Sequence, residues 1–493
     1  DGKVYSTSNT NQKSGSEITI MAFSGLKPGT EHSFCVRAGN ESGFSAYSPA
    51  GKVMTKIGKQ SGLPNGTSNK TYPDGKRPYM GLDPVNALTG AFLWSYTCLE
   101  DYGRDGLHFT AMYDSQRDEY FKALGSKWTY SFNYLLYMDQ EYAYFSTPYD
   151  EVVSFRKGSG ENGFRLAEGS GTGYCMGMTE DQFYFIRAVD GTEYIFDSGL
   201  SLNRIIEGGL VAYRFEKDSE GRIVKVTGRH GASLTITYVN GHISGVADAA
   251  GNGASFEYEG SFLKKITNPD GKSMTFSYDS TGNLLTITDC LGNDYLTNRY
   301  DVFGKVVTQN IAGRGDSCVA YDTVSHTTIF TDEAGNATKY SFDEAGHVTG
   351  IELAGNGIRQ SYDADGRLAE QTDRLGNVTR MAYDEFGRMN QVTYPDGSRE
   401  MISYNDRNYP VRIVNRDGSE SLYAYDDRNN LVSVQDERGN TSAYTYDEAD
   451  NLITYTDKEG HLWSYSYDAD HHLEQAEDPE GNCYRYSHDA IGR

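Results

Sequence analysis

Aspartates that directly follow an aromatic residue are the groups in this sequence with the clearest capacity for chemistry. Paired carboxylates can act as general acid and general base, and examples stand at Asp363, Asp384, Asp426 and Asp447. A catalytic pair is a single arrangement, whereas these aspartates recur periodically. Each also stands where a turn opens, so the pattern predicts that its side chain accepts a hydrogen bond from a later backbone N–H. We therefore predict turn chemistry here and no enzyme.

Two short motifs could bind a ligand. The run Asp363-Ala364-Asp365-Gly366 resembles the start of a calcium loop, but an EF-hand requires Glu where this chain has Arg374. The run Arg314-Gly315-Asp316 spells an adhesion tripeptide and lies where a glycine-rich turn is expected. We interpret both as products of turn composition.

Histidines and cysteines are the remaining candidate ligands. His471 and His472 are adjacent, but no Cys or third His stands at a suitable spacing, which favours a solvated turn over a metal site. The six cysteines form no CxxC pair, and we interpret them mostly as packed thiols, with a disulfide as the minor alternative. They are Cys35, Cys98, Cys175, Cys290, Cys318 and Cys483. We thus predict no catalytic, cofactor or metal site.

The overall composition limits the classes of protein to consider. The chain has 493 residues with a net charge of −24, which argues against a nucleic-acid-binding surface. No run of about 18 apolar residues could span a bilayer. Apolar area comes largely from 39 Tyr and 21 Phe, and 55 Gly indicate many turns. These features favour an all-β protein in an acidic, extracellular setting.

A repeat dominates the second half of the chain. The string Tyr-Asp-x-x-Gly-x-Leu recurs 14 times in steps of 20 to 22 residues, and the steps from Tyr383 onward are all 21. The copies, several of them degenerate, start at Lys217, Tyr238, Tyr258, Tyr278, Tyr300, Tyr321, Phe342, Tyr362, Tyr383, Tyr404, Tyr425, Tyr446, Tyr467 and His488. A fixed period of this length is typical of repeat architectures.

A second series of turns alternates with the first. Its glycines follow Asp at the same period, as in Asp396-Gly397 and Asp417-Gly418. Two turns in 21 residues leave two segments of about six residues, the usual length of a strand. Each repeat is therefore predicted to be two antiparallel strands.

The residues flanking each Tyr-Asp turn assign the strand faces. Rings alternate before the turn, as at Tyr423 and Tyr425, so both should lie on one face. After the turn, apolar pairs such as Leu431 and Val434 are three residues apart, which is not a strand period and predicts a bulge or an early strand end. Stacked repeats would place Tyr over Tyr in ladders.

The repeat string resembles the YD repeat of Rhs proteins, toxin-complex shells and teneurins. Ahead of the repeats, Asp83-Pro84-Val85 with Thr89-Gly90, and later Trp128, resemble the module that leads into Rhs repeats. Further upstream, Leu26 to Pro49 resembles the second half of a fibronectin type III domain.

The domain assignment follows from these resemblances. We predict a partial fibronectin type III-like domain at 1–57, a linker at 58–77, a leading module with degenerate early repeats at 78–210, and a YD-repeat array at 211–493. The predicted fold class is all-β: a long coiled antiparallel sheet of YD-repeat hairpins, part of a hollow β-shell, preceded by part of a β-sandwich.

The resemblance implies a function for the whole array. Such a shell would belong to a bacterial, secreted or cell-surface polymorphic toxin, and would enclose and deliver a C-terminal toxin domain that this chain does not contain. The alternative is an adhesion module that binds cell-surface carbohydrate or protein through exposed Tyr and Asp. Neither hypothesis requires a cofactor, nucleic acid or a transmembrane segment.

Overall fold

The computed structural model describes residues 85–100, 106–117, 123–148, 152–158, 163–167, 174–188, 190–468 and 471–487, with the backbone of four short strands nearer the N-terminus. Every strand and turn in these ranges belongs to an all-β fold, as predicted. Within the described part of the chain, no helix is long and apolar enough to cross a membrane.

The strands are numbered in chain order. The first are β1 (Glu31–Ser33), β2 (Gly39–Asn40), β3 (Gly43–Phe44), β4 (Lys52–Met54), β5 (Leu93–Glu100), β6 (His108–Asp114), β7 (Trp128–Tyr130), β8 (Leu135–Met138), β9 (Tyr142–Ser146), β10 (Val152–Lys157) and β11 (Phe164–Leu166). The next are β12 (Cys175–Met178), β13 (Tyr184–Arg187), β14 (Glu193–Phe196), β15 (Leu202–Glu207), β16 (Leu210–Lys217), β17 (Ile223–Gly228), β18 (Ser233–Val239), β19 (His242–Asp248), β20 (Gly253–Glu259), β21 (Phe262–Thr267), β22 (Ser273–Tyr278), β23 (Leu284–Thr288), β24 (Asp294–Tyr300), β25 (Val306–Ile311), β26 (Gly315–Asp322) and β27 (Thr327–Thr331). The last are β28 (Ala337–Phe342), β29 (Val348–Leu353), β30 (Asn356–Tyr362), β31 (Leu368–Thr372), β32 (Val378–Tyr383), β33 (Met389–Thr393), β34 (Arg399–Tyr404), β35 (Pro410–Val414), β36 (Glu420–Tyr425), β37 (Leu431–Gln435), β38 (Thr441–Tyr446), β39 (Leu452–Thr456), β40 (Leu462–Tyr467), β41 (Leu473–Glu477) and β42 (Cys483–Arg485).

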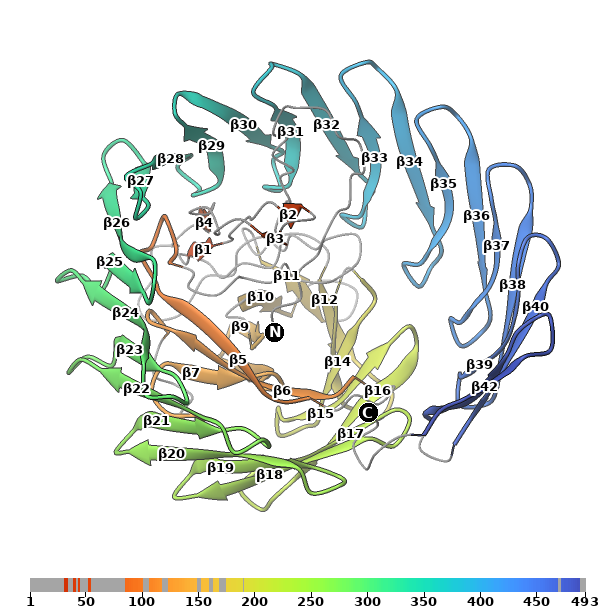
Figure 1. Cartoon of the computed structure of the whole chain (residues 1–493), viewed down its shortest axis with the longest axis horizontal. Coiled ribbons are helices and arrows are strands. Elements are labelled where there is room, and N and C mark those ends of the chain that lie inside the picture. The colour runs from red at the N-terminus through yellow and green to blue at the C-terminus, as the bar shows by residue number, and fades with distance from the viewer. Residues whose placement is uncertain are drawn as a thin grey trace.

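One sheet makes up most of the molecule. Strands β12 to β42 form a sheet of 31 strands in which chain neighbours pair antiparallel throughout. Figure 1 shows this sheet coiling through a full circle, so that β42 returns to the neighbourhood of β16 and β17. The predicted coiled sheet of hairpins is confirmed, and the coil follows from a small rotation between neighbouring strands that accumulates over many repeats.

The Tyr-Asp turns have the predicted chemistry. At Asp384, carboxylate oxygen Oδ1 accepts hydrogen bonds from the backbone N–H of Phe386 at 3.0 Å and of Arg388 at 2.9 Å. Gly387 donates its N–H to the Asp384 carbonyl at 3.0 Å and has φ of 83°, a left-handed conformation that favours glycine. Asp thus opens the turn and Gly closes it.

The predicted bulge lies directly after the turn. Tyr425 pairs with Leu431 while Ala424 pairs with Ser433, so Val432 is an extra residue without a partner in this ladder. The same shift in register recurs at Tyr383 and Tyr404. A bulge allows apolar residues three positions apart to share one face.

A tyrosine hydroxyl continues the hydrogen bonding between two neighbouring strands beyond their last paired backbone residues. The ladder between β33 and β34 stops at Gln391, yet the Tyr404 hydroxyl donates to the carbonyl of Met389 at 2.8 Å. Backbone carbonyls need a partner when water is excluded, and this bond, which we call the Tyr latch, supplies one. Latches of 2.6 to 3.0 Å are formed by Tyr238, Tyr258, Tyr278, Tyr300, Tyr321, Tyr362, Tyr383, Tyr404, Tyr425, Tyr446 and Tyr467.

The prediction that these tyrosines stack on one another is wrong. Tyr404 lies under the guanidinium of Arg388, 4.8 Å from the ring centroid, and Tyr383 lies under Arg367 in the same way. The cause is strand spacing: YD tyrosines stand on every second strand, and two spacings of about 4.8 Å exceed stacking distance. The residue that follows the turn glycine of the preceding repeat fills the gap instead.

The leading module fills the inside of one part of the coil. Strands β5–β7 lie within the circle in Figure 1, where Trp94 and Trp128 contact Phe276 with ring centroids 5.5 and 5.1 Å apart. The Tyr113 hydroxyl donates to the Gly282 carbonyl at 2.8 Å. The face that carries Phe276 and Tyr278 is therefore the inner face of the sheet.

Some predictions fall outside the described residues. Apart from the backbone of β1 to β4, the fibronectin-like region 1–57 and the linker 58–77 lie there, as do Asp83, Pro84 and Cys35. The fibronectin type III assignment therefore stays a prediction. The large sheet begins at β12, inside the region assigned to the leading module and early repeats.

Candidate functional site

The coil meets itself along a line of turns that we call the seam. On one side are turns 188–191, 207–210 and 228–231, which belong to the second turn series near the start of the sheet. On the other are the Tyr-Asp turns 405–409, 426–430, 447–451 and 468–472. One rim of the early sheet thus faces the opposite rim of the late sheet, as in a spiral (Figure 1).

Side chains hold the seam because turns offer no strand edge to pair. The Asn429 side-chain amide donates to the Gly208 carbonyl, and Arg229 forms an ion pair with Asp450. Both contacts join residues 221 positions apart, so one circuit of the wall takes about ten repeats. The rings of His230 and His471 lie edge to face, with centroids 5.7 Å apart.

Asp450 is the central charged group of the seam. Its side chain is 5% exposed, and a charge this deeply buried requires partners. Besides Arg229 it has Arg428, whose Nη1 lies 3.0 Å from Oδ1, and the Asn430 amide, which donates to Oδ1 at 2.7 Å. The two cations and the amide together balance one buried carboxylate, which ties two repeats to the start of the wall.

Backbone approaches closely at Gly208. A Cβ placed on this residue would lie 2.5 Å from the Asn429 amide nitrogen and 2.7 Å from the Tyr409 hydroxyl. Its φ is 58°, so both space and conformation require glycine. Nearby, burial raises the pKa of the Asp190 carboxyl. Burial, and then the charges of Glu207 and Asp190, raise the pKa of the Tyr409 hydroxyl.

The inner face beyond the leading module carries an aromatic surface. Tyr444 stacks on Tyr455 and Tyr455 on Trp463, with centroids 5.1 and 5.3 Å apart and rings within 26° of parallel. All three are half-buried, and Tyr444 occupies the repeat position of Phe276, which places it on the inner face. The outer face instead carries ion pairs such as Arg380–Glu370 and Arg412–Glu420.

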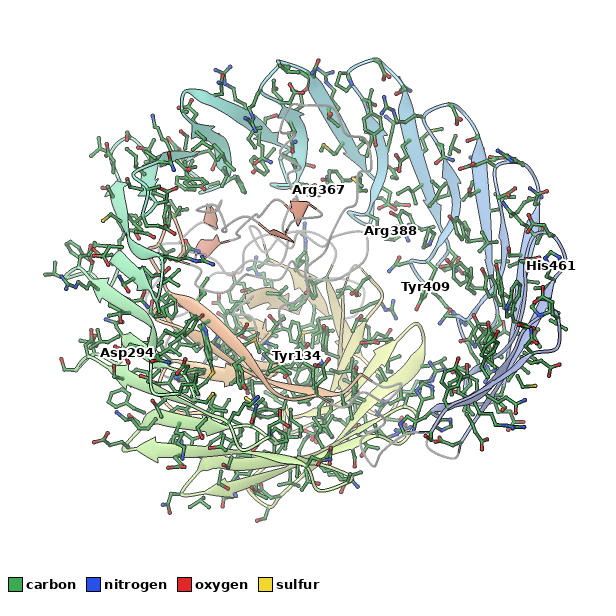
Figure 2. All side chains as sticks on the ribbon, viewed as in Figure 1. Tyr134, Asp294, Arg367, Arg388, Tyr409 and His461 are labelled. Atoms are coloured by element: carbon green, nitrogen blue, oxygen red, sulfur yellow. The ribbon has the colours of Figure 1, made fainter. Side chains whose placement is uncertain are left out.

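The wall has two rims, one formed by the Tyr-Asp turns and one by the second series of turns, and Figure 2 labels residues from both. Arg367, Arg388 and Tyr409 each follow the left-handed residue of a Tyr-Asp turn and succeed one another along the inner edge of the circle. His461, from the second turn series, lies at the outer edge. The Tyr-Asp rim is therefore the one that faces the centre and reaches the seam.

The two ligand-like motifs of the sequence lie at turns, and Gly315 and Asp316 of the adhesion-like motif begin strand β26. Arg367 pairs with both Asp363 and Asp365, at 2.7 and 2.8 Å, so a cation already occupies the carboxylates of the calcium-like run. Arg314 donates its N–H to the Ile311 carbonyl at 2.9 Å in the exposed turn between β25 and β26. The expected turn in the adhesion-like motif is confirmed.

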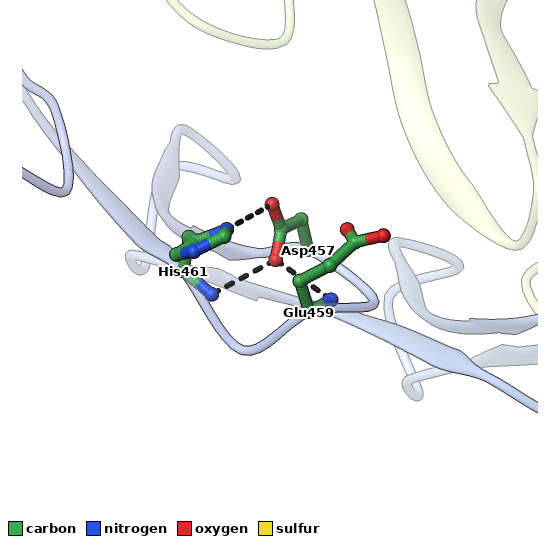
Figure 3. A group of neighbouring side chains, drawn as sticks. All are labelled: Asp457, Glu459 and His461. Carbon is green, nitrogen blue, oxygen red and sulfur yellow. Dashed lines mark hydrogen bonds and ion pairs between the residues drawn. The ribbon is translucent and has the colours of Figure 1, made fainter.

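One further group has metal-ligand composition. Asp457, Glu459 and His461 gather in the turn between β39 and β40 (Figure 3). Asp457 accepts the backbone N–H of Glu459 and His461 through Oδ1, and His461 Nδ1 lies 2.9 Å from its Oδ2. The carboxylate is thus engaged as in the other Asp turns, where Arg or Asn replaces His.

Two interpretations need correction. His471 is half-buried in the seam against His230 and does not lie in a fully solvated turn. Of the five cysteines among the described residues only Cys98 is buried, all five are free, and Cys175, Cys290, Cys318 and Cys483 are exposed. The packed-thiol interpretation fails because most of these cysteines stand in a single-layer wall, where one strand face or rim always meets solvent.

Sequence reasoning missed the seam, although a signal was present. The turn glycine of the repeat is lost in four consecutive copies, where the chain has Asn408, Asn429, Asp450 and His471. These are among the residues that tolerate φ above zero best. No feature of the neighbouring sequence predicts that these residues contact residues 191 to 230.

The geometry describes a repeat protein whose single-layer antiparallel wall coils back on itself. Comparison with known families agrees: the RHS Repeat family model matches residues 262–294, 362–399, 425–462 and 446–482. A family described as Domain of unknown function (DUF6531) matches residues 82–155, which includes strands β5–β9 and most of β10. The RHS Repeat matches lie within the predicted YD-repeat array, and the DUF6531 match lies within the predicted leading module and early repeats.

Other comparisons give only distant likenesses. No curated protein matches the sequence. Among solved structures, the Photorhabdus luminescens Tc holotoxin pore is 13% identical over 76% of this chain and 26% of that chain, with a TM-score of 0.31. TcdB2-TccC3 without its hypervariable C-terminal region is 13% identical over 78% and 27%, also with a TM-score of 0.31. This chain spans about a quarter of the length of those chains.

Proposed function

We propose that this chain is part of the wall of a bacterial Rhs-type container that encloses and delivers a C-terminal toxin domain lying outside this chain. The observation that carries the proposal is the seam, because side chains 221 residues apart join the wall into a closed circuit. A closed wall separates its contents from the surrounding solution and leaves no long sheet edge along its length. Secretion or display at the cell surface follows from the same proposal.

The inner surface supports enclosure as well. Residues facing inward beyond the leading module are mainly uncharged, as the stacked Tyr444, Tyr455 and Trp463 illustrate. The ion pairs Arg380–Glu370 and Arg412–Glu420 lie on the outer face, and Arg367 and Arg388 pair with turn aspartates at the Tyr-Asp turns. Such a division suits a wall that is soluble outside and accepts polypeptide inside.

Protection from protease tests this proposal. The full-length protein, with its C-terminal domain, is digested under native conditions, and the isolated C-terminal domain is digested in parallel. We expect the enclosed domain to survive at least tenfold longer than the isolated one. Equal rates of digestion would refute enclosure.

The alternative function, adhesion through exposed aromatic residues, has less support. Among the described tyrosines only Tyr484 and Tyr486 are exposed, and the repeat tyrosines are engaged in latches. A glycan array probed with this chain separates the alternatives. Specific binding that is lost in Tyr484→Ala and Tyr486→Ala would favour adhesion over a purely enclosing wall.

A further inference from the structure

The turn residue that differs between repeats is the one with left-handed backbone. In most Tyr-Asp turns from Asp218 to Arg388 this residue is glycine, as at Gly366 and Gly387 with φ of 74° and 83°, and His326 is an exception with φ of 50°. In the next four repeats the φ is kept but the glycine is not. The residues are Asn408, Asn429, Asp450 and His471, with φ of 67°, 66°, 63° and 65°.

A side chain in this conformation is unfavourable for the turn itself. Glycine adopts positive φ without steric conflict, whereas an L-residue brings its Cβ close to the backbone. Four successive losses of glycine therefore weaken each local turn. The contacts that these four side chains make, and that glycine could not make, offset this cost.

Each of the four side chains has at least one contact to its own end of the wall. Asn408 Oδ1 accepts from Arg388 at 2.5 Å, and Asn429 Oδ1 accepts from Arg407 at 2.9 Å. The other two follow the same rule, with Asn430 donating to Asp450 at 2.7 Å and the Asn451 amide 3.1 Å from the His471 Nδ1 atom. These partners all belong to the preceding repeat.

Each also reaches the opposite side of the seam. Asn429 donates to the Gly208 carbonyl, and Asp450 pairs with Arg229. His471 packs against His230, and the Asn408 amide lies next to Gly191, 3.2 Å from where its Cβ would stand. Repeats with glycine in this position have no side chain for either task.

From this pattern we propose that the four left-handed side chains are the closure determinants of the wall. They mark the repeats at which the coil has completed one circuit, and they bind that part of the rim to turns 188–191, 207–210 and 228–231. The partner of this surface is therefore the start of the same wall. The inference rests on the closed wall of the proposed function but not on any enclosed domain.

Restoring the repeat glycine gives a direct test. In Asn429→Gly/Asp450→Gly the two turns gain a residue that suits positive φ but lose their contacts to the preceding repeat, so a purely local role changes only the late end of the wall. Closure predicts an effect on the far turns as well. We expect backbone amides in turns 207–210 and 228–231 to exchange hydrogen at least tenfold faster, although they are 221 residues away from the changes.

Matched controls use left-handed residues outside the seam. Ala354→Gly and Asn240→Gly make the same exchange at φ of 51° and 52°, in the turns of β29–β30 and β18–β19. Amide exchange at turns 207–210 and 228–231 should not change in these controls. Arg229→Ala, altered from the other side, should accelerate exchange in turn 447–451.

Two results would overturn the inference. One is a rate of amide hydrogen exchange in turns 207–210 and 228–231 of the double variant that equals the rate in the control variants. The other is an Arg229→Ala variant in which turn 447–451 is as protected as in the parent. Because glycine suits the altered turns, the variants should fold, and far-turn exchange does not depend on a payload. Loss of protease protection of the enclosed domain is measured separately, so each proposal can fail alone.

Discussion

The coil contains two stretches of wall built from the same repeat but placed in different surroundings. Strands β18–β25 carry the leading module on their inner face, and Phe256 and Phe276 there are 5% and 3% exposed. Strands β36–β41 have no such layer among the described strands, and Tyr423 and Tyr444 at the equivalent positions are half-buried. The Tyr latch is the same in both stretches.

This contrast separates what builds the wall from what fills it. Asp turns, bulges and latches lie within one repeat or between two neighbours, so they form whether or not a second layer is present. The side chains on the inner face differ between the two stretches. Phe and Leu pack where the leading module covers the face, and Tyr and Trp, whose rings carry a polar atom, stand where it does not. Stability in the covered stretch should therefore depend on the core, and in the uncovered stretch on the rims.

The largest expected effect is in the covered stretch. Trp128→Ala removes a fully buried ring that packs on Phe276 and donates to the Tyr278 hydroxyl at 2.9 Å. We expect a loss of about 3–5 kcal/mol of unfolding free energy, measured by urea denaturation. Trp463→Ala, on the uncovered inner face, should lose less than half as much. Equal losses would contradict the contrast.

The next effect concerns the turns that both stretches share. Gly387→Val forces a β-branched residue into φ of 83° and should lower the free energy of unfolding by about 2 kcal/mol. A polar change at Asn390, such as Asn390→Ser, should stay within about 0.5 kcal/mol. Thermal melts of the two variants check this pair, and indistinguishable melting temperatures would refute the turn assignment.

Removing one hydroxyl compares the latch in the two stretches. Tyr404→Phe leaves the Met389 carbonyl without its partner at a rim that solvent can reach, so we expect a loss of about 1 kcal/mol. Tyr278→Phe orphans both the Leu263 carbonyl and the Trp128 indole N–H under the leading module, and about 2 kcal/mol is expected. Equal losses on urea denaturation, or a larger loss for Tyr404→Phe, would show that burial under the leading module does not increase the effect.

The smallest effect is a difference in pH response between turns and seam. Backbone and side-chain hydrogen bonds, led at Asp396 by the Ser398 hydroxyl, lower the pKa of that carboxyl to about 2. A lowered pKa stabilises the fold above about pH 4, and this contribution is lost as the pH falls toward 2. The raised pKa of Asp190 acts in the opposite sense, because its ionised form is disfavoured in the fold.

The dependence of melting temperature on pH measures both contributions, that of the turn aspartates and that of Asp190. The whole wall should lose stability as the pH falls from about 4 toward 2, because the aspartates of the unfolded chain take up protons before the turn aspartates of the fold do. Above pH 4, Asp190→Asn should remove a small decline in stability with rising pH and leave the acid transition unchanged. A variant whose pH profile matches the parent throughout would show that Asp190 does not contribute.

Sequence reasoning succeeded where the interactions are short in range. The Asp384 turn, the bulge beside Tyr425 and the face shared by Tyr423 and Tyr425 all follow from spacing within one hairpin. It failed on the partner of Tyr404, because the stacking residue, Arg388, belongs to the preceding hairpin and strand spacing excludes the neighbouring Tyr. It failed on His471 for a similar reason, since His230 comes close only after a complete circuit.

By itself, the sequence determined the period, the two turns in each repeat, the antiparallel strands and the sharing of one face by the rings, because each depends on contacts within about 21 residues. Only the tertiary structure decided where the coil closes, which stretch is filled and why four turns gave up glycine. Those outcomes depend on a small rotation per strand summed over some ten repeats. That sum brings Asp450 to Arg229, and no local pattern contains it.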